Sequence, residues 1–290
     1  MRLVAVVLTL GLLVCLGCSS KPPVGNVAGE AIKLEYKTHG GVPAQFKMAY
    51  SVSLNIGGTT QEWMSDIVYS SKVDSIAPDG TIVRRITFDD FSIAELSGGA
   101  PTPDPEAAGY KGQYLWLKLG PAGEVADWKG LDGIRNYTPE LRDLKSVLVL
   151  LMALSNPPMP AEAASVGTKW QTKLELPVMM AGGDFNLTIT TNYEVASFGV
   201  RAGSSCARVR FTSDCVGSGT GFRSADRKYW LDQHGQGKGD LWFDHGSGLV
   251  IDYSLNLTVD QVRKYERAGK EDIATEASTV DSGIKIKVVR

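Results

Sequence analysis

The chain has 290 residues, of which 43% are hydrophobic and 21% are charged, a composition typical of folded proteins and not of disordered ones. Its 30 Lys and Arg residues against 32 Asp and Glu residues give a net charge of −2, which excludes a strongly basic nucleic-acid-binding protein. Three His and four Cys residues make a multi-ligand transition-metal site hard to assemble, so we predict no metal site.

The N-terminal segment has the pattern of an export signal. Arg2 supplies a positive charge, and an apolar run from Leu3 to Leu16 follows it. As a helix this run would be about 21 Å long, too short to cross a hydrocarbon core of about 30 Å, which is typical of a signal peptide. At its end, Gly17 directly precedes Cys18 and then Ser19, an order that resembles the lipobox of bacterial lipoproteins.

The resemblance to a lipobox implies cleavage before Cys18 and attachment of diacylglycerol and an N-acyl chain to that residue. Several acyl chains on one residue give stable anchoring, so the membrane is an expected partner and no other cofactor is implied. We expect residues 1–17 to be the signal peptide and residues 18–30 an acylated tether. Ser19 implies the outer membrane facing the periplasm in a Gram-negative cell. The alternative is a secretory peptide that is cut elsewhere.

Export also decides how the remaining cysteines are interpreted. Cys206 and Cys215 are the two thiols left in the body of the chain, and an oxidising compartment permits them to form a disulfide. Against the disulfide, residues 206–212 alternate like a strand, and a straight strand would hold the two sulfur atoms too far apart. The bond requires a turn near Ser213, so both states remain open.

The body of the chain alternates between apolar and polar residues, as half-buried β-strands do. The clearest run extends from Phe46 to Ile56, and residues 185–195 and 249–259 repeat the pattern. Shorter stretches of the same kind predict strands at residues 32–36, 82–88, 170–176, 207–211 and 284–288. Alternation with one polar face indicates antiparallel sheets that are packed on one side and wet on the other.

Two segments of the chain resemble each other in sequence. Residues 115–128 and residues 241–253 both begin with Leu-Trp, continue through a glycine-containing turn and end on an aromatic residue. Self-similarity of this kind favours an internal duplication, although alternating strands can also converge on it. We therefore predict a mainly β fold of two tandem antiparallel curved sheets or half-barrels, the first at residues 31–135 and the second at residues 166–290. Within the second unit, residues 260–282 are expected to form a charged surface excursion.

One helix is predicted in the connecting segment, residues 136–165. Thr138 and Pro139 suit its first positions, leucines recur at spacings of three and four residues, and Pro157 follows its end. We expect the helix over residues 138–155. It serves either as a connector packed on both sheets or as a lid over an apolar cavity.

The order of elements after the helix resembles a family of uncharacterised bacterial lipoproteins. The similarity lies in Pro158-Met159-Pro160, in residues 166–170 and in residues 237–239 with the strand that follows. More distantly, a lipobox combined with curved antiparallel sheets resembles periplasmic carriers of lipids and lipoproteins, which hold an acyl chain in an open half-barrel closed by helices. The resemblance implies an architecture and transfers no catalytic residue.

Aromatic residues are the strongest candidates for a ligand site, because concave and mostly apolar pockets are the usual places where small molecules bind. The candidate lining residues are Trp116, Trp128, Trp242 and Tyr253, and the alternative is that they belong to the core. The glycine-rich stretch 235–239 lacks the Gly-Lys-Ser/Thr of a phosphate loop and is interpreted as a flexible entry into a strand.

Two classes of function follow from these observations. The first is a lipid-anchored, non-enzymatic binding or scaffolding protein of the cell envelope that holds an apolar ligand between its sheets, with lipid or envelope proteins as partners. The alternative is an envelope hydrolase that combines His39, His234 or His245 with a serine and a carboxylate. No Gly-x-Ser-x-Gly motif is present, so we predict no catalytic residue.

Overall fold

The computed structural model describes residues 31–38, 42–97, 100–105, 107–121, 124–134, 144–180, 183–224, 227–266 and 273–289. The predicted signal peptide, residues 1–17, and the predicted tether, residues 18–30 with the lipid-attachment residue Cys18, lie outside these residues. The same holds for His39 and for the predicted start of the helix at Thr138.

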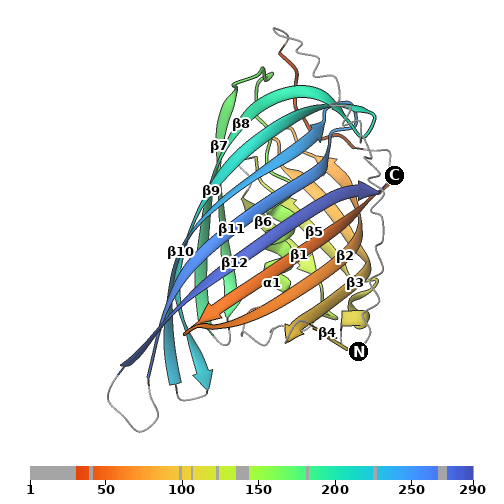
Figure 1. The fold of residues 1–290 in the computed structure, drawn as a ribbon. Helices are drawn as coiled ribbons and strands as arrows, with labels where there is room; N and C mark the ends of the chain where they lie inside the picture. Colours follow the sequence, from red (N-terminus) through yellow and green to blue (C-terminus); the bar gives the residue numbers. More distant parts are fainter. Residues whose placement is uncertain are drawn as a thin grey trace, which may run out of the picture.

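One antiparallel sheet forms the body of the protein (Figure 1), with the strand order β6-β5-β3-β2-β1-β12-β11-β10-β9-β8-β7 and with β4 added beside β3. The first half of the chain supplies β1 (Ala44–Ile56), β2 (Thr59–Ile76), β3 (Ile82–Ser97), β4 (Ala100–Pro103), the short helix η1 (Ala107–Tyr110), β5 (Tyr114–Leu119) and β6 (Val125–Gly130). The second half supplies α1 (Leu144–Leu154), β7 (Lys169–Met180), β8 (Gly183–Arg201), β9 (Ser204–Ser224), β10 (Arg227–Asp244), β11 (Leu249–Glu266) and β12 (Ile273–Val289).

The first and last strands of the sheet in chain order join its two halves. β1 pairs with β12 from Gln45 opposite Val289 to Ile56 opposite Ser278. The two edge strands, β6 and β7, approach each other at the seam, so the sheet is barrel-like and nearly closed. The predicted mainly β fold is therefore confirmed. The predicted division into two tandem half-barrels is not confirmed, because the halves share one continuous ladder of hydrogen bonds.

Alternation along the strands directs one set of side chains into the concave face. On β1, Phe46 and Met48 are buried while Lys47 and Ala49 are exposed. The register places Phe46 opposite Tyr69, and their rings stack with centroids 5.2 Å apart. Similar inward rows on β3, β5, β8, β9, β11 and β12 meet these residues in one large apolar core. Burial of this core is the main stabilising contribution to the fold.

The convex face of the sheet carries many polar and charged side chains. Arg208 forms an ion pair with Asp240 at 2.9 Å across β9 and β10. On β11 and β12, the Thr258 hydroxyl donates to Asp281 at 2.6 Å, and other hydroxyl–carboxylate pairs continue along the strands. These polar contacts lie on the side of each strand opposite the apolar core.

Among the residues that the structure describes, no helix is both long enough and apolar enough to cross a membrane.

Glycines occupy alternate inward positions of β10, at Gly235, Gly237 and Gly239. A Cβ atom on Gly239 would lie 2.1 Å from the carbonyl oxygen of Ser254 and 2.4 Å from Cζ of Phe211. The missing side chains therefore let a neighbouring strand and an aromatic ring approach the backbone, as glycines in strands often do. The predicted flexible strand entry at residues 235–239 is wrong, because these residues lie inside a long, fully paired strand.

Residues 31–38, which we call the strap, pack against the core with alternate side chains instead of forming the predicted strand at 32–36. Their one described bridge pairs Ile32 with Ala164, with two backbone hydrogen bonds of 2.8 Å. Leu34 and Tyr36 are buried, and the Tyr36 hydroxyl donates to the carbonyl oxygen of Pro157 at 2.8 Å. The Tyr36 ring also meets Phe243 edge to face. The strap thus joins the core as an irregular segment.

Helix α1 lies within the curve of the sheet (Figure 1). Eight of its side chains are buried, because this helix is apolar around most of its circumference: Leu144, Ser146, Leu148, Val149, Leu151, Met152, Ala153 and Leu154. The prediction that this helix ends before Pro157 is confirmed. There the Asn156 side chain donates to the carbonyl oxygen of Met152 at 2.8 Å and satisfies one of the last helical acceptors.

Candidate functional site

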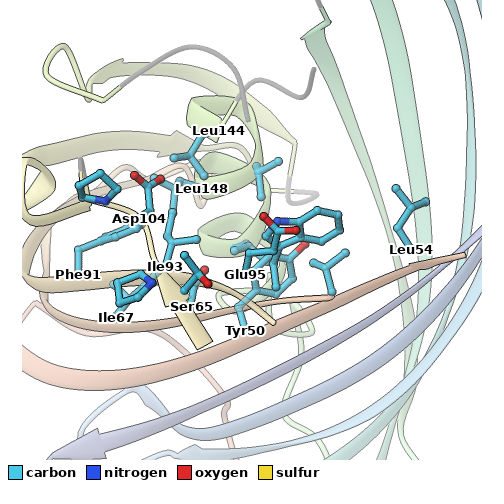
Figure 2. Close-up of a pocket in the computed structure, with 17 residues that line it drawn as sticks. Tyr50, Leu54, Ser65, Ile67, Phe91, Ile93, Glu95, Asp104, Leu144 and Leu148 are labelled. Atoms are coloured by element: carbon cyan, nitrogen blue, oxygen red, sulfur yellow. The ribbon is translucent and has the colours of Figure 1, made fainter. Parts of the chain in front are cut away.

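An apolar cavity of about 260 Å³ lies between α1 and the first half of the sheet. Figure 2 shows Tyr50, Ile67 and Phe91 from the strands on one side and Leu144 and Leu148 from the helix on the other. The remaining lining residues come from β1, β2, β3, β4 and the turn after β4: Val52, Leu54, Trp63, Ser65, Ile93, Glu95, Thr102, Pro103, Asp104 and Pro105, together with Val147 and Leu151 of α1.

A second cavity of about 110 Å³ lies on the other side of the helix, against β8 to β12. It is lined by inward side chains such as Leu187, Ile189 and Leu255. The two cavities share Tyr50, Val147 and Leu151 as lining residues, so they are neighbours beneath one helix. We call them together the α1 cavities.

The sizes of the inward side chains on β1 and β2 explain why the first cavity is not filled. Where the core is solid, the inward positions of β1 and β2 carry the large rings of Phe46 and Tyr69. Farther along the same strands, the inward pairs are Tyr50 with Ser65 and Val52 with Trp63. The short side chains of Ser65 and Val52 do not reach α1, so an unfilled volume remains between helix and sheet.

Few polar groups line the α1 cavities. The first cavity has the carboxylates of Glu95 and Asp104, and the second has the side-chain amides of Gln233 and Gln261. The Gln261 amide donates to the Gln233 oxygen at 3.0 Å, and Arg263 donates to the Gln261 oxygen at 3.4 Å. A mostly apolar lining with a few polar groups is typical of a site for an amphiphilic small molecule.

Two of the predicted ligand-lining residues are on the convex face. Trp116 lies under the Lys129 ammonium, which is 4.4 Å from the centre of its ring. Trp242 lies beneath Arg201 and Arg208, at 5.5 Å and 5.9 Å. Their assignment to an apolar cavity is wrong, because the leucines that alternate with them on the same strands take the inward positions. Cationic side chains cover both rings instead.

The other two predicted lining residues point inward but belong to the packed core. Trp128 packs against the core from β6, and Tyr253 is buried with its ring stacked at 5.4 Å on that of Phe211. Burial raises the pKa of the Tyr253 phenol well above its ordinary value. Neither residue lines the α1 cavities. Trp63, another aromatic residue that the sequence offered for such a cavity, does line the first cavity.

Cys206 and Cys215 are both buried on β9. A strand rises about 3.3 Å per residue, so the nine steps between them span about 30 Å. A disulfide needs Cα atoms about 6 Å apart. The turn near Ser213 that the bond required is not present, since β9 continues through that residue, so of the two states left open the structure shows the unbonded one.

The described histidines lie away from the α1 cavities. His245 places Nε2 3.0 Å from the Ser205 hydroxyl on an exposed turn. The adjacent Asp244 carboxylate instead accepts the backbone amides of Gly246 and Ser247, at 2.9 and 3.2 Å. His234 is exposed on β10. Within the described ranges, no contact joins either histidine to a carboxylate, and no cluster of three or more potential metal ligands is found.

Comparison with known proteins gives no family for this chain: no family model matches, and no curated protein matches. Among solved structures, a mutant porin of Rh. blastica is 5% identical, with 86% of this chain and 100% of that chain covered and a TM-score of 0.18. A structure described as "Asymmetric conductivity of engineered proteins" is 6% identical, with 85% and 100% covered and a TM-score of 0.18. Likenesses this weak carry no argument, so the candidate site rests on its own geometry.

Proposed function

We propose that this protein is a lipid-anchored component of the cell envelope that binds an apolar ligand, such as an acyl chain, in the α1 cavities. The observation that carries the proposal is the pair of apolar cavities that share Tyr50, Val147 and Leu151 beneath one helix. Well-packed interiors leave few voids larger than a water molecule, so unfilled space on this scale favours a binding role.

The chemistry of the lining fits a hydrocarbon chain. Transfer of one methylene group from water to an apolar site contributes about 0.8 kcal/mol, so a chain of several methylene groups would bind without specific polar contacts. Glu95, Asp104, Gln233 and Gln261 would contact the polar end of such a ligand. Lipids and other envelope proteins are therefore the partners that we propose.

The anchor that we propose is the acylated Cys18, followed by the tether of residues 18–30. In a Gram-negative cell this would hold the protein at the outer membrane, facing the periplasm. The polar convex face supports a position beside the membrane, since that face carries ion pairs such as Arg208 with Asp240.

Filling the cavities tests the binding proposal. Val147 lines both cavities, and the Val147→Trp variant is expected to weaken binding of a fluorescent fatty-acid probe by about tenfold or more, equivalent to about 1.4 kcal/mol. The matched control is Val216→Trp, because Val216 is 53% exposed on β9 and outside both cavities. Titration of the probe into each protein gives the affinities. Equal affinities for both variants and the parent protein, or no binding by the parent, would refute the proposal.

Removal of the anchor tests the localisation. Cys18→Ser is expected to move the protein from the membrane fraction to the soluble fraction and to abolish the mass increase due to acyl chains, because serine offers no thiol for acylation. Cys206→Ser is the matched control and should stay acylated and membrane-bound, since Cys206 lies on β9 and far from the lipobox. Cell fractionation measures how much of each variant is membrane-bound, and mass spectrometry measures whether it is acylated. Acylated, membrane-bound Cys18→Ser protein would contradict the assignment of the anchor.

A further inference from the structure

A buried arginine on β3 lies outside the α1 cavities. Arg84 is on the inward face, opposite Val73 of β2 and Leu117 of β5, and only 1% of its surface is exposed. Its Nη1 donates to the Ser71 hydroxyl at 3.1 Å. Its guanidinium lies over the ring of Tyr36 in the strap, 5.2 Å from the ring centre. These two contacts hold the guanidinium in place.

The other edge of the same guanidinium has no partner. Nε and Nη2 are both buried and make no hydrogen bond within the part of the chain that the structure describes. These two nitrogens form one side of the planar group, and their N–H bonds point the same way. Two parallel N–H donors at this spacing match the two oxygens of a carboxylate or phosphate. The unpartnered edge of the Arg84 guanidinium, formed by Nε and Nη2, therefore has the geometry of a bidentate oxyanion site.

The positive charge of Arg84 is also uncompensated by its described neighbours. Among the described residues no ion pair joins Arg84 to a carboxylate, and the titratable groups that interact with its charge are the phenols of Tyr36 and Tyr69. Burial raises the pKa of both phenols, so they stay neutral and supply no negative charge. Burial also lowers the pKa of Arg84, but guanidinium groups stay protonated in proteins. A buried cation without a counter-charge is strongly unfavourable and needs an external one.

We propose that the Nε and Nη2 edge of Arg84 is a binding site for an oxyanion, either a carboxylate or a phosphate group. The anion would form two charge-assisted hydrogen bonds, while Ser71 and the Tyr36 ring keep the guanidinium plane fixed. Access requires movement of the strap, because Tyr36 covers Arg84 and belongs to no strand of the sheet. The contacts that this movement would break are the Ile32–Ala164 bridge, the hydrogen bond from Tyr36 to Pro157 and the hydrogen bonds from Lys33 and Lys37 to backbone carbonyl oxygens.

Titration of the full-length protein with anions tests this proposal. Sodium acetate and inorganic phosphate are added at constant ionic strength, balanced with chloride, and the arginine Nε–H resonances are followed by NMR. The Arg84 resonance is identified by its loss in Arg84→Lys, which keeps a charge but lacks the two-donor edge. We expect this resonance to shift and saturate with acetate, with phosphate or with both. The pattern shows which oxyanion the site accepts. A resonance that stays unchanged with both anions would overturn the proposal.

Thermal unfolding gives a second readout with a matched control. The same anions should raise the Tm of the parent protein and of Arg85→Met, because Arg85 is the outward neighbour on the same strand, with a side chain that is 55% exposed. Arg84→Met should show no such rise. An equal rise in Arg84→Met, or no rise in the parent protein, would overturn the proposal, because the anions would then act elsewhere or not bind at all.

Discussion

Gly239→Ala is expected to lower the free energy of unfolding by about 3 kcal/mol, the largest destabilisation that we predict for a single added methyl group. The new Cβ would lie 2.1 Å from the carbonyl oxygen of Ser254 and 2.4 Å from Cζ of Phe211. A backbone oxygen cannot move aside as a flexible side chain can. The Phe211 ring is also held, because it stacks on Tyr253 and contacts Tyr193. Relief of the clash must therefore distort the pairing of β10 with β11.

Gly199→Ala is the matched control for this prediction. Gly199 also lies within a strand, β8, but an added Cβ there would meet no atom within 4 Å. We expect its free energy of unfolding to change by less than about 1 kcal/mol, with a slight stabilisation from the lower entropy of the unfolded chain. Urea unfolding of the parent protein and both variants measures the difference. Equal shifts in the two midpoints would show that β10 tolerates a side chain at Gly239.

The inward face of most strands could be predicted from sequence because burial imposes a period of two on each strand separately. Phe46 to Ile56 shows this, since the residues that alternate as apolar are those that face the core. β2 was not predicted, because its inward row includes Ser65 and Ser71, which break the apolar pattern. Residues 260–282, expected as a surface excursion, instead belong largely to β11 and β12, where charged residues such as Asp260, Lys264 and Asp281 are exposed.

The arrangement of the strands could not be predicted in the same way. Alternation shows which side chains are buried but not which strands are neighbours, so the pairing of β1 with β12 gave no local signal. The strap was expected to be a strand because Ile32, Leu34 and Tyr36 alternate. Leu34 and Tyr36 are indeed buried, but inside a segment that pairs with the sheet nowhere in the described structure.

About half of the candidate site followed from sequence. The inward row of β1 and the apolar helix were both predicted, and they supply Tyr50, Val147 and Leu151 to the α1 cavities. The aromatic residues chosen as lining were not in the cavities, because a tryptophan on a strand can be covered by a cation on the outer face as well as by the core. Trp116 beneath Lys129 is the clearest case. Arg84 was missed although it shares the alternation of Ile82, Ile86 and Phe88, because an arginine in a strand usually faces water.

Arg84→Met is expected to raise the free energy of unfolding by about 2 kcal/mol in chloride buffer, the largest stabilisation that we predict. The side chain of Met is shorter but follows the path of the arginine methylene groups, while the cost of burying a charge without a counter-charge is removed. The variant loses the hydrogen bond to Ser71 and the contact with the Tyr36 ring, each of which contributes about 1 kcal/mol. The desolvation of the guanidinium outweighs both, because its Nε and Nη2 atoms have no partner.

Arg85→Met serves as the control for the stability of Arg84→Met. Arg85 is 55% exposed and forms one ion pair with Asp74 at 3.4 Å, so its replacement should change the free energy of unfolding by less than about 1 kcal/mol. Both variants and the parent protein are refolded from urea into chloride buffer, which removes any bound oxyanion, and then unfolded again. A lower stability of Arg84→Met than of the parent protein would show that the buried charge is already compensated. A higher stability would mean that the fold retains an unfavourable cation, as a binding site for an oxyanion requires.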